Sequence, residues 1–336
     1  QGNIPEASGQ YLRLVEFYPD DLEGRIALSE MAFLRRDLEE FERHSVVAIE
    51  LAPQDPRVQA IEVAGLYQKA VRDENGPARE VAFDKAVALI KDQPDNMLLQ
   101  EIEIDGHIQN EDFAKALDAI DRAIQTNPDN RLLAEFRLEM LGKLQDIDGY
   151  EAQLRYIVTT FPVEDDTYRD RLIGLIRLYL SRDEADKAEA FLREISDPNA
   201  EDSASYGFLI DFILQQRGAE AAIAELDQVI PTLDNPGRYQ AMRAGILFNQ
   251  GKRDTAIADL EAAIAATEPS EQQRDMKVIL ADMLQKTSNE VGARQLVEQV
   301  LAEDPTQVAA LRMSAAWQIQ AGDTDQAINT LRTALD

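Results

Sequence analysis

The sequence predicts an all-α protein, a solenoid of stacked antiparallel helix pairs with no β-sheet. Three observations lead to this prediction. A small or apolar residue recurs with a period of 34 residues, the segments around it have the apolar spacing of amphipathic helices, and proline-containing turns separate successive units. No stretch shows the alternation of a half-buried strand, and no glycine-rich strand-to-helix turn occurs.

The period is read from the residue that begins the second helical segment of each unit. Six of the nine steps between these residues are 34 residues long, and the other three are 41, 38 and 37. A unit of this length, repeated along the whole chain, is typical of a repeat architecture. The ten positions are Ala7, Phe41, Ala82, Ala116, Tyr150, Ala188, Ala222, Ala256, Ala293 and Ala327.

Residues 98–130 show what one unit contains. In residues 112–126, apolar or small side chains recur at helical spacing from Phe113 to Ile124, and charged residues fall on the opposite face. The sequence NPDN then ends this helix, because proline cannot continue it and Asp or Asn can cap the next one. Residues 98–110 form the preceding helix of the pair. A hairpin of two short helices cannot bury its own apolar faces, so identical hairpins are expected to stack side by side.

Three irregular joints interrupt the period. The step of 41 residues contains VRDENGPAREV, residues 71–81, which we interpret as an enlarged turn inside the third unit. The steps of 38 and 37 residues add PVEDDTYRD and EPSEQQRD between units, near residues 163–168 and 268–273. We expect these last two joints to be seams at which the array bends, without separating independent domains.

The charge of the chain restricts its partners. There are 63 acidic and 34 basic residues, which gives a net charge of -29. Such a surface repels nucleic acid and anionic lipid, so we expect neither as a partner and favour a basic protein or peptide. No apolar run is long enough for direct membrane insertion. The first residue is Gln1 and not Met, so a targeting segment could lie upstream, and bacterial cytoplasm and periplasm both remain open.

Motifs for chemistry are missing. The chain has no cysteine and only two histidines, His44 and His107, with no paired-histidine or acidic calcium-loop spacing. We therefore expect no metal, no cofactor and no catalytic residue, and hence no enzyme. His107 is expected in a structural, at least half-buried position, and His44 on a helix face.

The repeat resembles the tetratricopeptide repeat family. Two units carry the residues of that family's pattern. In residues 238–269 these are Ala244, Gly251, Ala256, Leu260 and Ala263. In the last unit they are Ala315, Gly322, Asp323, Ala327, Leu331 and Ala334. The resemblance covers essentially residues 1–336, although Phe41 and Tyr150 replace a small residue. It implies a single right-handed superhelical solenoid of about nine and a half antiparallel hairpins.

The resemblance also implies a binding site. In this family the first helix of each hairpin lines the concave face. The positions that point into it are acidic in the amino-terminal half, at Glu23, Glu30, Glu101, Asp105, Glu135 and Glu139, opposite Arg57 and Lys143. We expect a groove suited to a basic peptide or to a Lys- and Arg-bearing partner surface. The alternative, that these acids only solvate an empty groove, stays open.

The function expected from these observations is that of a non-catalytic scaffold for protein–protein interaction. Two alternatives remain: the substrate-selecting repeat region of a larger enzyme such as a glycosyltransferase, or an envelope or secretion-system assembly component. Both ends of the sequence fall inside a repeat. We therefore expect a fragment of a longer bacterial protein, whose uncapped terminal repeats are candidates for end-to-end self-packing.

Overall fold

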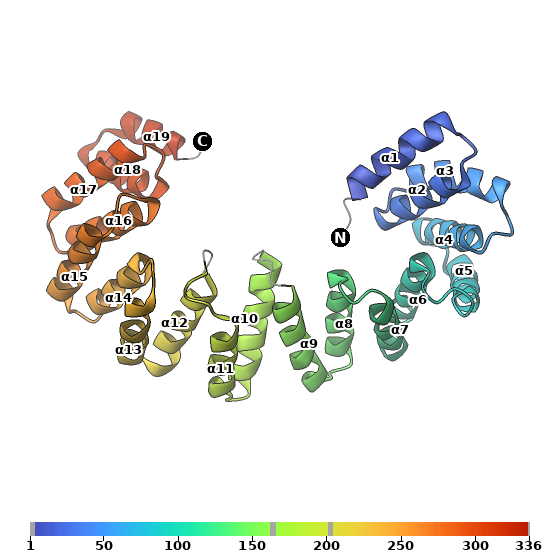
Figure 1. Ribbon diagram of the computed structural model, residues 1–336, viewed down its shortest axis with the longest axis horizontal. Coiled ribbons are helices and arrows are strands. Elements are labelled where there is room, and N and C mark those ends of the chain that lie inside the picture. The colour runs from blue at the N-terminus through green and yellow to red at the C-terminus, as the bar shows by residue number, and fades with distance from the viewer. Residues whose placement is uncertain (1–3, 162–165, 201–203, 335–336) are drawn as a thin grey trace. The chain divides into compact units, whose positions relative to one another are not determined.

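The computed structural model describes residues 4–161, 166–200 and 204–334, and within these ranges it contains α-helices, one short 3-10 helix and no strand (Figure 1). The prediction of an all-α helical-repeat solenoid is confirmed. The chain divides into two compact units, Gln1–Leu178 and Tyr179–Asp336, and each is described by itself.

The first unit is a row of helices in which, from α1 to α9, each packs against the next. Its last helix continues by three residues into the second unit. The helices are α1 (Ile4–Phe17), α2 (Leu22–Leu34), α3 (Leu38–Leu51), α4 (Pro56–Arg72), α5 (Gly76–Leu89), α6 (Met97–Gln109), α7 (Phe113–Thr126), α8 (Arg131–Lys143), α9 (Ile147–Thr160) and α10 (Asp166–Ser181).

The second unit repeats the same arrangement. Its helices are α11 (Ala185–Ile195), α12 (Ala204–Arg217), α13 (Ala219–Val229), the 3-10 helix η1 (Ile230–Thr232), α14 (Gly237–Asn249), α15 (Arg253–Ala266), α16 (Glu271–Lys286), α17 (Glu290–Glu303), α18 (Val308–Ala321) and α19 (Thr324–Thr333).

Short turns of one kind join the two helices of a hairpin. Between α2 and α3, α4 and α5, α6 and α7, and α8 and α9, three residues suffice. The middle residue has a left-handed backbone, as Glu111 shows with φ 56°. The third is Asp or Asn, whose side chain accepts a hydrogen bond from a backbone N–H three residues on, as Asp112 does from Lys115. This cap satisfies a donor that a helix start would otherwise leave unpaired.

The joint expected as an enlarged turn within residues 71–81 differs from that expectation. The turn of residues 73–75 is as short as the others, and the extra residues lengthen α4 to 17 residues, against 13 in α2, α6 and α8. In α3, Phe41 lies four residues after the helix cap. The residue at the same distance from the cap of α5 is Arg79, and the buried Ala82 follows it by about one helical turn. Of the joint near residues 163–168, residues 163–165 lie outside the described residues. The joint near residues 268–273 covers the last three residues of the link between α15 and α16, residues 268–270, and the start of α16.

The core runs from hairpin to hairpin along each unit. One cluster in the first unit joins α2 to α6, a second joins α6 to α8, and a cluster in the second unit joins α14 to α18. Ala116 and Ala123 are fully buried, so the small residues of the repeat allow close approach of neighbouring helices. His44 is also buried, with 2% of its surface exposed. His44 was expected on a helix face; it lies in α3, and the side of the helix that carries it is buried, because Arg25 and Glu40 give its ring polar partners.

Candidate functional site

The six predicted site residues lie on the first helices of three hairpins in the first unit. Glu23 and Glu30 belong to α2, Glu101 and Asp105 to α6, and Glu135 and Glu139 to α8. The helix α4 packs against both α2 and α6, so these helices form one continuous layer. The structure gives the six carboxyl groups different environments.

Glu23 is paired. Its two carboxylate oxygens accept hydrogen bonds from Arg57 Nη1 and Nη2 at 2.8 and 2.7 Å, across the interface between α2 and α4. This hydrogen-bonded pair lowers the pKa of Glu23. Arg57 is thereby held on α4 and also contacts Asp55 Oδ2 at 3.4 Å. Glu23 therefore offers little free charge to a partner.

Glu30 is half-buried and unpaired. Among the described residues no basic group lies within ion-pairing distance of its carboxylate. Burial raises the pKa of Glu30, Arg57 opposes this effect, and Glu23 adds to it. A carboxylate that loses water without gaining a partner is costly for the folded protein.

The acidic pair on α6 is divided in the same way. Asp105 Oδ2 accepts a hydrogen bond of 2.6 Å from the Tyr67 hydroxyl of α4. Glu101, one helical turn earlier, is half-buried, and burial raises its pKa, with Asp105 adding and Arg36 opposing. Within the described part of the chain no cation forms an ion pair with Glu101.

The pair on α8 differs again. Glu135 Oε2 lies 2.8 Å from both Nε and Nη2 of Arg171 in α10, while its Oε1 is buried without a hydrogen-bond partner in the described structure. Glu139 is exposed. The structure thus places Glu23 and Glu135 in salt bridges and leaves Glu30 and Glu101 as partly buried, unpaired charges.

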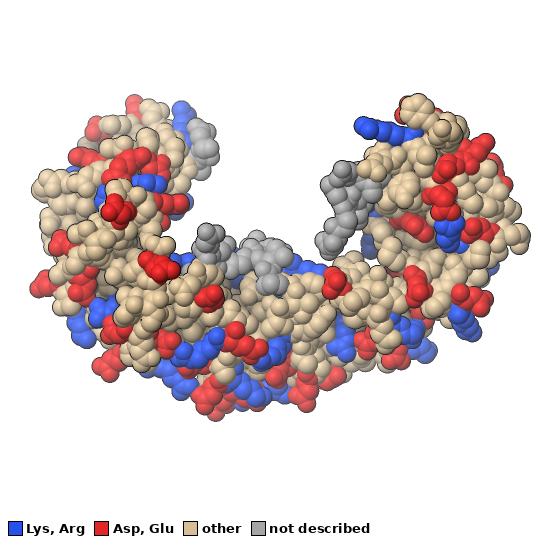
Figure 2. Space-filling view, viewed as in Figure 1, with Lys and Arg blue, Asp and Glu red and all other residues tan. Residues whose placement is uncertain are grey.

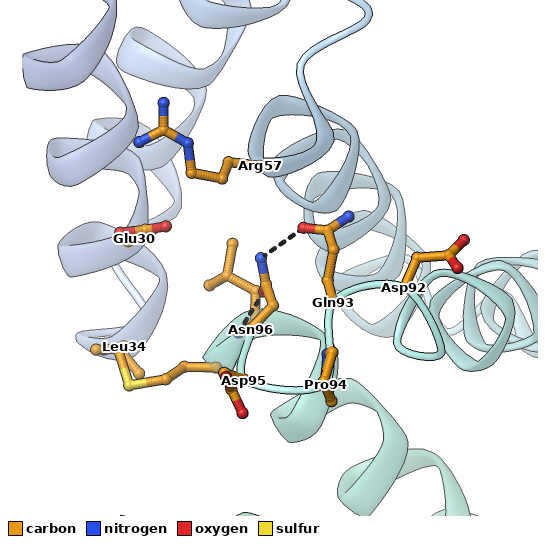
Figure 3. Close-up of a pocket in the computed structure, with 10 residues that line it drawn as sticks. Glu30, Leu34, Arg57, Asp92, Gln93, Pro94, Asp95 and Asn96 are labelled. Carbon is orange, nitrogen blue, oxygen red and sulfur yellow. Dashed lines mark hydrogen bonds between the residues drawn. The ribbon is translucent and has the colours of Figure 1, made fainter. Parts of the chain in front are cut away.

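A pocket opens beside Glu30, with a volume of about 480 Å³ (Figure 3). Its walls are the end of α2, the start of α4, and residues 92–98, which lead from α5 into α6. Glu30 and Arg57 lie on the pocket side in Figure 3, whereas Asp92 points away from it. Its volume is within the range of small-ligand and side-chain pockets.

The described residues contain no group of three or more side chains that could hold a metal ion. No described helix combines the length and apolar character needed to span a bilayer. On the face shown in Figure 2, acidic and basic side chains are interspersed over each unit, not separated into one acidic area. The unpaired carboxylates, and not total acidity, therefore single out a place on the first unit.

Comparison with known families decides what kind of repeat this is. Two family models, both described as tetratricopeptide repeat, match residues 242–308 and 288–336. These ranges contain most of α14 and the helices from α15 to α19, where the structure has successive capped hairpins. Residues 242–336 of the chain belong to the tetratricopeptide repeat family.

Solved structures similar to this chain are remote in sequence, and no curated protein matches it. A tetratricopeptide repeat protein from Parabacteroides merdae is 15% identical, with 94% of this chain and 99% of that chain covered and a TM-score of 0.36. Yeast Tom70 is 16% identical, with 98% of this chain and 88% of that chain covered and a TM-score of 0.38. The structure of Naa15/Naa10 bound to HypK-THB is 15% identical, with 88% of this chain and 44% of that chain covered and a TM-score of 0.41. The chain thus spans less than half of the length of that chain.

Sequence reasoning missed the partners of the acidic residues in the predicted site. Arg171 and Tyr67 were not among the expected site residues, and neither were residues 92–98 of the pocket. A signal existed for Arg57, which lies 34 residues after Glu23 and therefore at the same place in the next repeat. Residues at equal places in adjacent repeats are neighbours in a stacked array, so opposite charges there predict a salt bridge.

Proposed function

We propose that this tetratricopeptide repeat protein is a non-catalytic scaffold that binds a basic peptide, or a basic segment of a partner protein, along α2, α4 and α6. The observation that supports this proposal is the pair of half-buried, unpaired carboxylates, Glu30 and Glu101. Each has lost water without gaining a cation, and a Lys or Arg of the partner would supply that cation.

This proposal is narrower than the acidic groove expected from the sequence. Glu23 and Glu135 already have arginine partners, so they contribute less to recognition. Glu30, Glu101 and the exposed Glu139 remain available. The net charge of -29 would also speed the encounter with a basic partner and make binding sensitive to salt.

The test uses a blocked peptide of alternating lysine and serine, with the full chain and isothermal titration calorimetry. We expect the double variant Glu30→Gln/Glu101→Gln to bind at least about tenfold more weakly, a loss of ~1.4 kcal/mol. The matched control is Glu39→Gln/Glu50→Gln on α3, which removes the same charge from exposed positions of a second helix. Equal loss in both variants would mean that only total charge matters, and the proposal would fail.

The same double variant carries a second expectation, about stability. Burial raises the pKa of both carboxyl groups, so their protonated forms favour the folded state, and this stabilisation is lost as pH rises through the folded-state pKa. At neutral pH the ionised groups therefore oppose folding. Glu30→Gln/Glu101→Gln should raise the melting temperature while weakening peptide binding, a combination typical of functional residues. A lower melting temperature would contradict this assignment.

A further inference from the structure

The side-chain amide groups in the wall of the pocket beside Glu30 have hydrogen-bond partners. Gln93 donates to the carbonyl oxygen of Pro56 at 2.9 Å and accepts from Asn96 at 3.2 Å. Asn96 in turn accepts from the N–H groups of Leu98 and Leu99 at the start of α6. These hydrogen bonds engage the side-chain amide groups of Gln93 and Asn96. In Figure 3, dashed lines mark the hydrogen bonds between the residues that are drawn.

The basic group of the wall is also engaged. Arg57 forms the bidentate pair with Glu23, so its guanidinium is directed to α2 above the pocket. Three carboxylates line the pocket, those of Glu30, Asp92 and Asp95, and none of them forms an ion pair within the described structure. Asp92 points away from the pocket, whereas Glu30 lies on its side (Figure 3). The amide groups and Arg57 are thus held in place, and the negative charge of Glu30 is left without a paired cation.

The rim of the pocket is apolar. Leu34 at the end of α2 and Met97 at the start of α6 both line it, and they are 44% and 43% exposed. An exposed apolar rim beside a half-buried charge suits a side chain with an aliphatic stem and a cationic end. Lysine and arginine have this character, whereas an acidic or purely apolar side chain would leave Glu30 unpaired.

We propose that this pocket receives one lysine or arginine side chain of the bound peptide, with its stem on Leu34 and Met97 and its charge at Glu30. The inference rests on the proposed function and adds to it a single anchoring position. Glu101 contacts a different part of the peptide, because it does not line the pocket. The two carboxylates therefore have separable roles.

The experiment follows the methyl group of Met97 by nuclear magnetic resonance in protein labelled at the methionine methyl carbons. The chain has seven methionines, and the Met97→Leu variant assigns the signal. The peptide of alternating lysine and serine, or its arginine counterpart, should shift the Met97 signal saturably. The lysine-acetylated peptide should not, because acetylation keeps the stem and removes the charge. In Glu30→Gln the shift should disappear at equal peptide concentration, and in Glu101→Gln it should persist at higher concentration.

A second variant tests the apolar rim. Leu34→Gln should weaken binding about threefold to tenfold, whereas Leu132→Gln, at a position on α8 that is 60% exposed and outside the pocket, should not. Binding that depends on Glu101 while the Met97 signal stays still would overturn the pocket assignment and leave the proposed function standing. No binding of either basic peptide would overturn both. An equal shift with the acetylated peptide would show an apolar site and refute the anchoring charge.

Discussion

At the scale of single residues, His44 combines deep burial with two polar contacts. Arg25 Nη1 lies 2.9 Å from Nδ1 of His44, and Glu40 Oε1 lies 3.1 Å from Nε2. The arginine side chain can only donate hydrogen bonds, so Nδ1 of His44 is the acceptor of the bond from Arg25. Nε2 therefore carries the ring hydrogen and donates a hydrogen bond to Glu40. The imidazole is therefore neutral and links α2 to α3. Burial lowers the pKa of His44, with Glu40 opposing and Arg25 and Arg43 contributing to the lowering.

This neutral His44 predicts a pH dependence of stability. Because its folded-state pKa lies below the value of about 6.5 for an unfolded chain, the unfolded state takes up the proton first as pH falls. The contribution of His44 is present above that value and is lost below it. The difference in unfolding free energy between the wild type and His44→Gln should shrink from about pH 7.5 to about pH 5, as measured by urea denaturation.

The glutamine variant is the appropriate comparison because its amide can accept from Arg25 and donate to Glu40. The raised pKa values of Glu30, Glu101 and Asp211 act in the opposite direction, but they are common to both proteins and cancel in the difference. A difference that stays constant with pH would rule out the neutral, buried imidazole.

At the scale of helices, the contact between α5 and α6 depends on a residue without a side chain. A Cβ atom on Gly106 would lie 2.1 Å from Cδ2 of Phe83, far inside contact distance. The Phe83 ring also meets the edge of His107, with ring centres 5.1 Å apart. Gly106 thus lets the two helices approach across a large aromatic side chain, and His107 has the structural, half-buried place expected from the sequence.

Gly106→Ala is therefore predicted to destabilise the protein. Alanine favours a helix over glycine by about 1 kcal/mol, but overpacking costs about 1–3 kcal/mol and should prevail at this contact. The control is Gly245→Ala within α14, where a new Cβ meets nothing within 4 Å and stability should rise. Thermal denaturation measures both. A gain for Gly106→Ala would mean that the Phe83 ring turns aside at little cost.

The helices were the part of this protein that its sequence predicted best. Apolar spacing, small residues and the Asp or Asn before α3, α5, α7 and α9 act locally, and residues 112–126 fold as their pattern predicts. The extra turn of α4 escaped prediction because a helix can lengthen by one turn without changing its buried face. For the site, the sequence predicted which helices carry acids, but not which acids find partners. That depends on side chains from other hairpins, such as Arg171 and Tyr67.

At the scale of the whole molecule, the excess of acid sets a general repulsion. The 34 basic residues against 63 acidic ones leave a net charge of -29. Many basic residues are held between helices, as Arg243 is between Asp227 and Asp259 at 2.5 and 2.7 Å. Most of these pairs are exposed to solvent and contribute little each. Self-repulsion of the remaining acids should therefore dominate the response to salt.

Raising sodium chloride from about 20 to about 300 mM should increase the melting temperature and weaken binding of the lysine-containing peptide, because salt screens both interactions. Calorimetry at neutral pH measures the two effects on the same sample. A melting temperature that falls with salt would show that the interhelical ion pairs outweigh the repulsion. Potassium glutamate at equal ionic strength is a control for specific chloride binding.

The lengthened α4 gives the first unit a local projection. Four additional residues carry the turn of residues 73–75 about 6 Å farther along the helix axis than in a hairpin of ordinary length. Beside it, Tyr67, Arg79, Phe83 and Gly106 line a second hollow of about 340 Å³. Growth by whole helical turns changes the outline of a repeat while its packed face stays the same. In evolutionary terms, this is a way for one repeat in a row to acquire an individual shape without disturbing its neighbours.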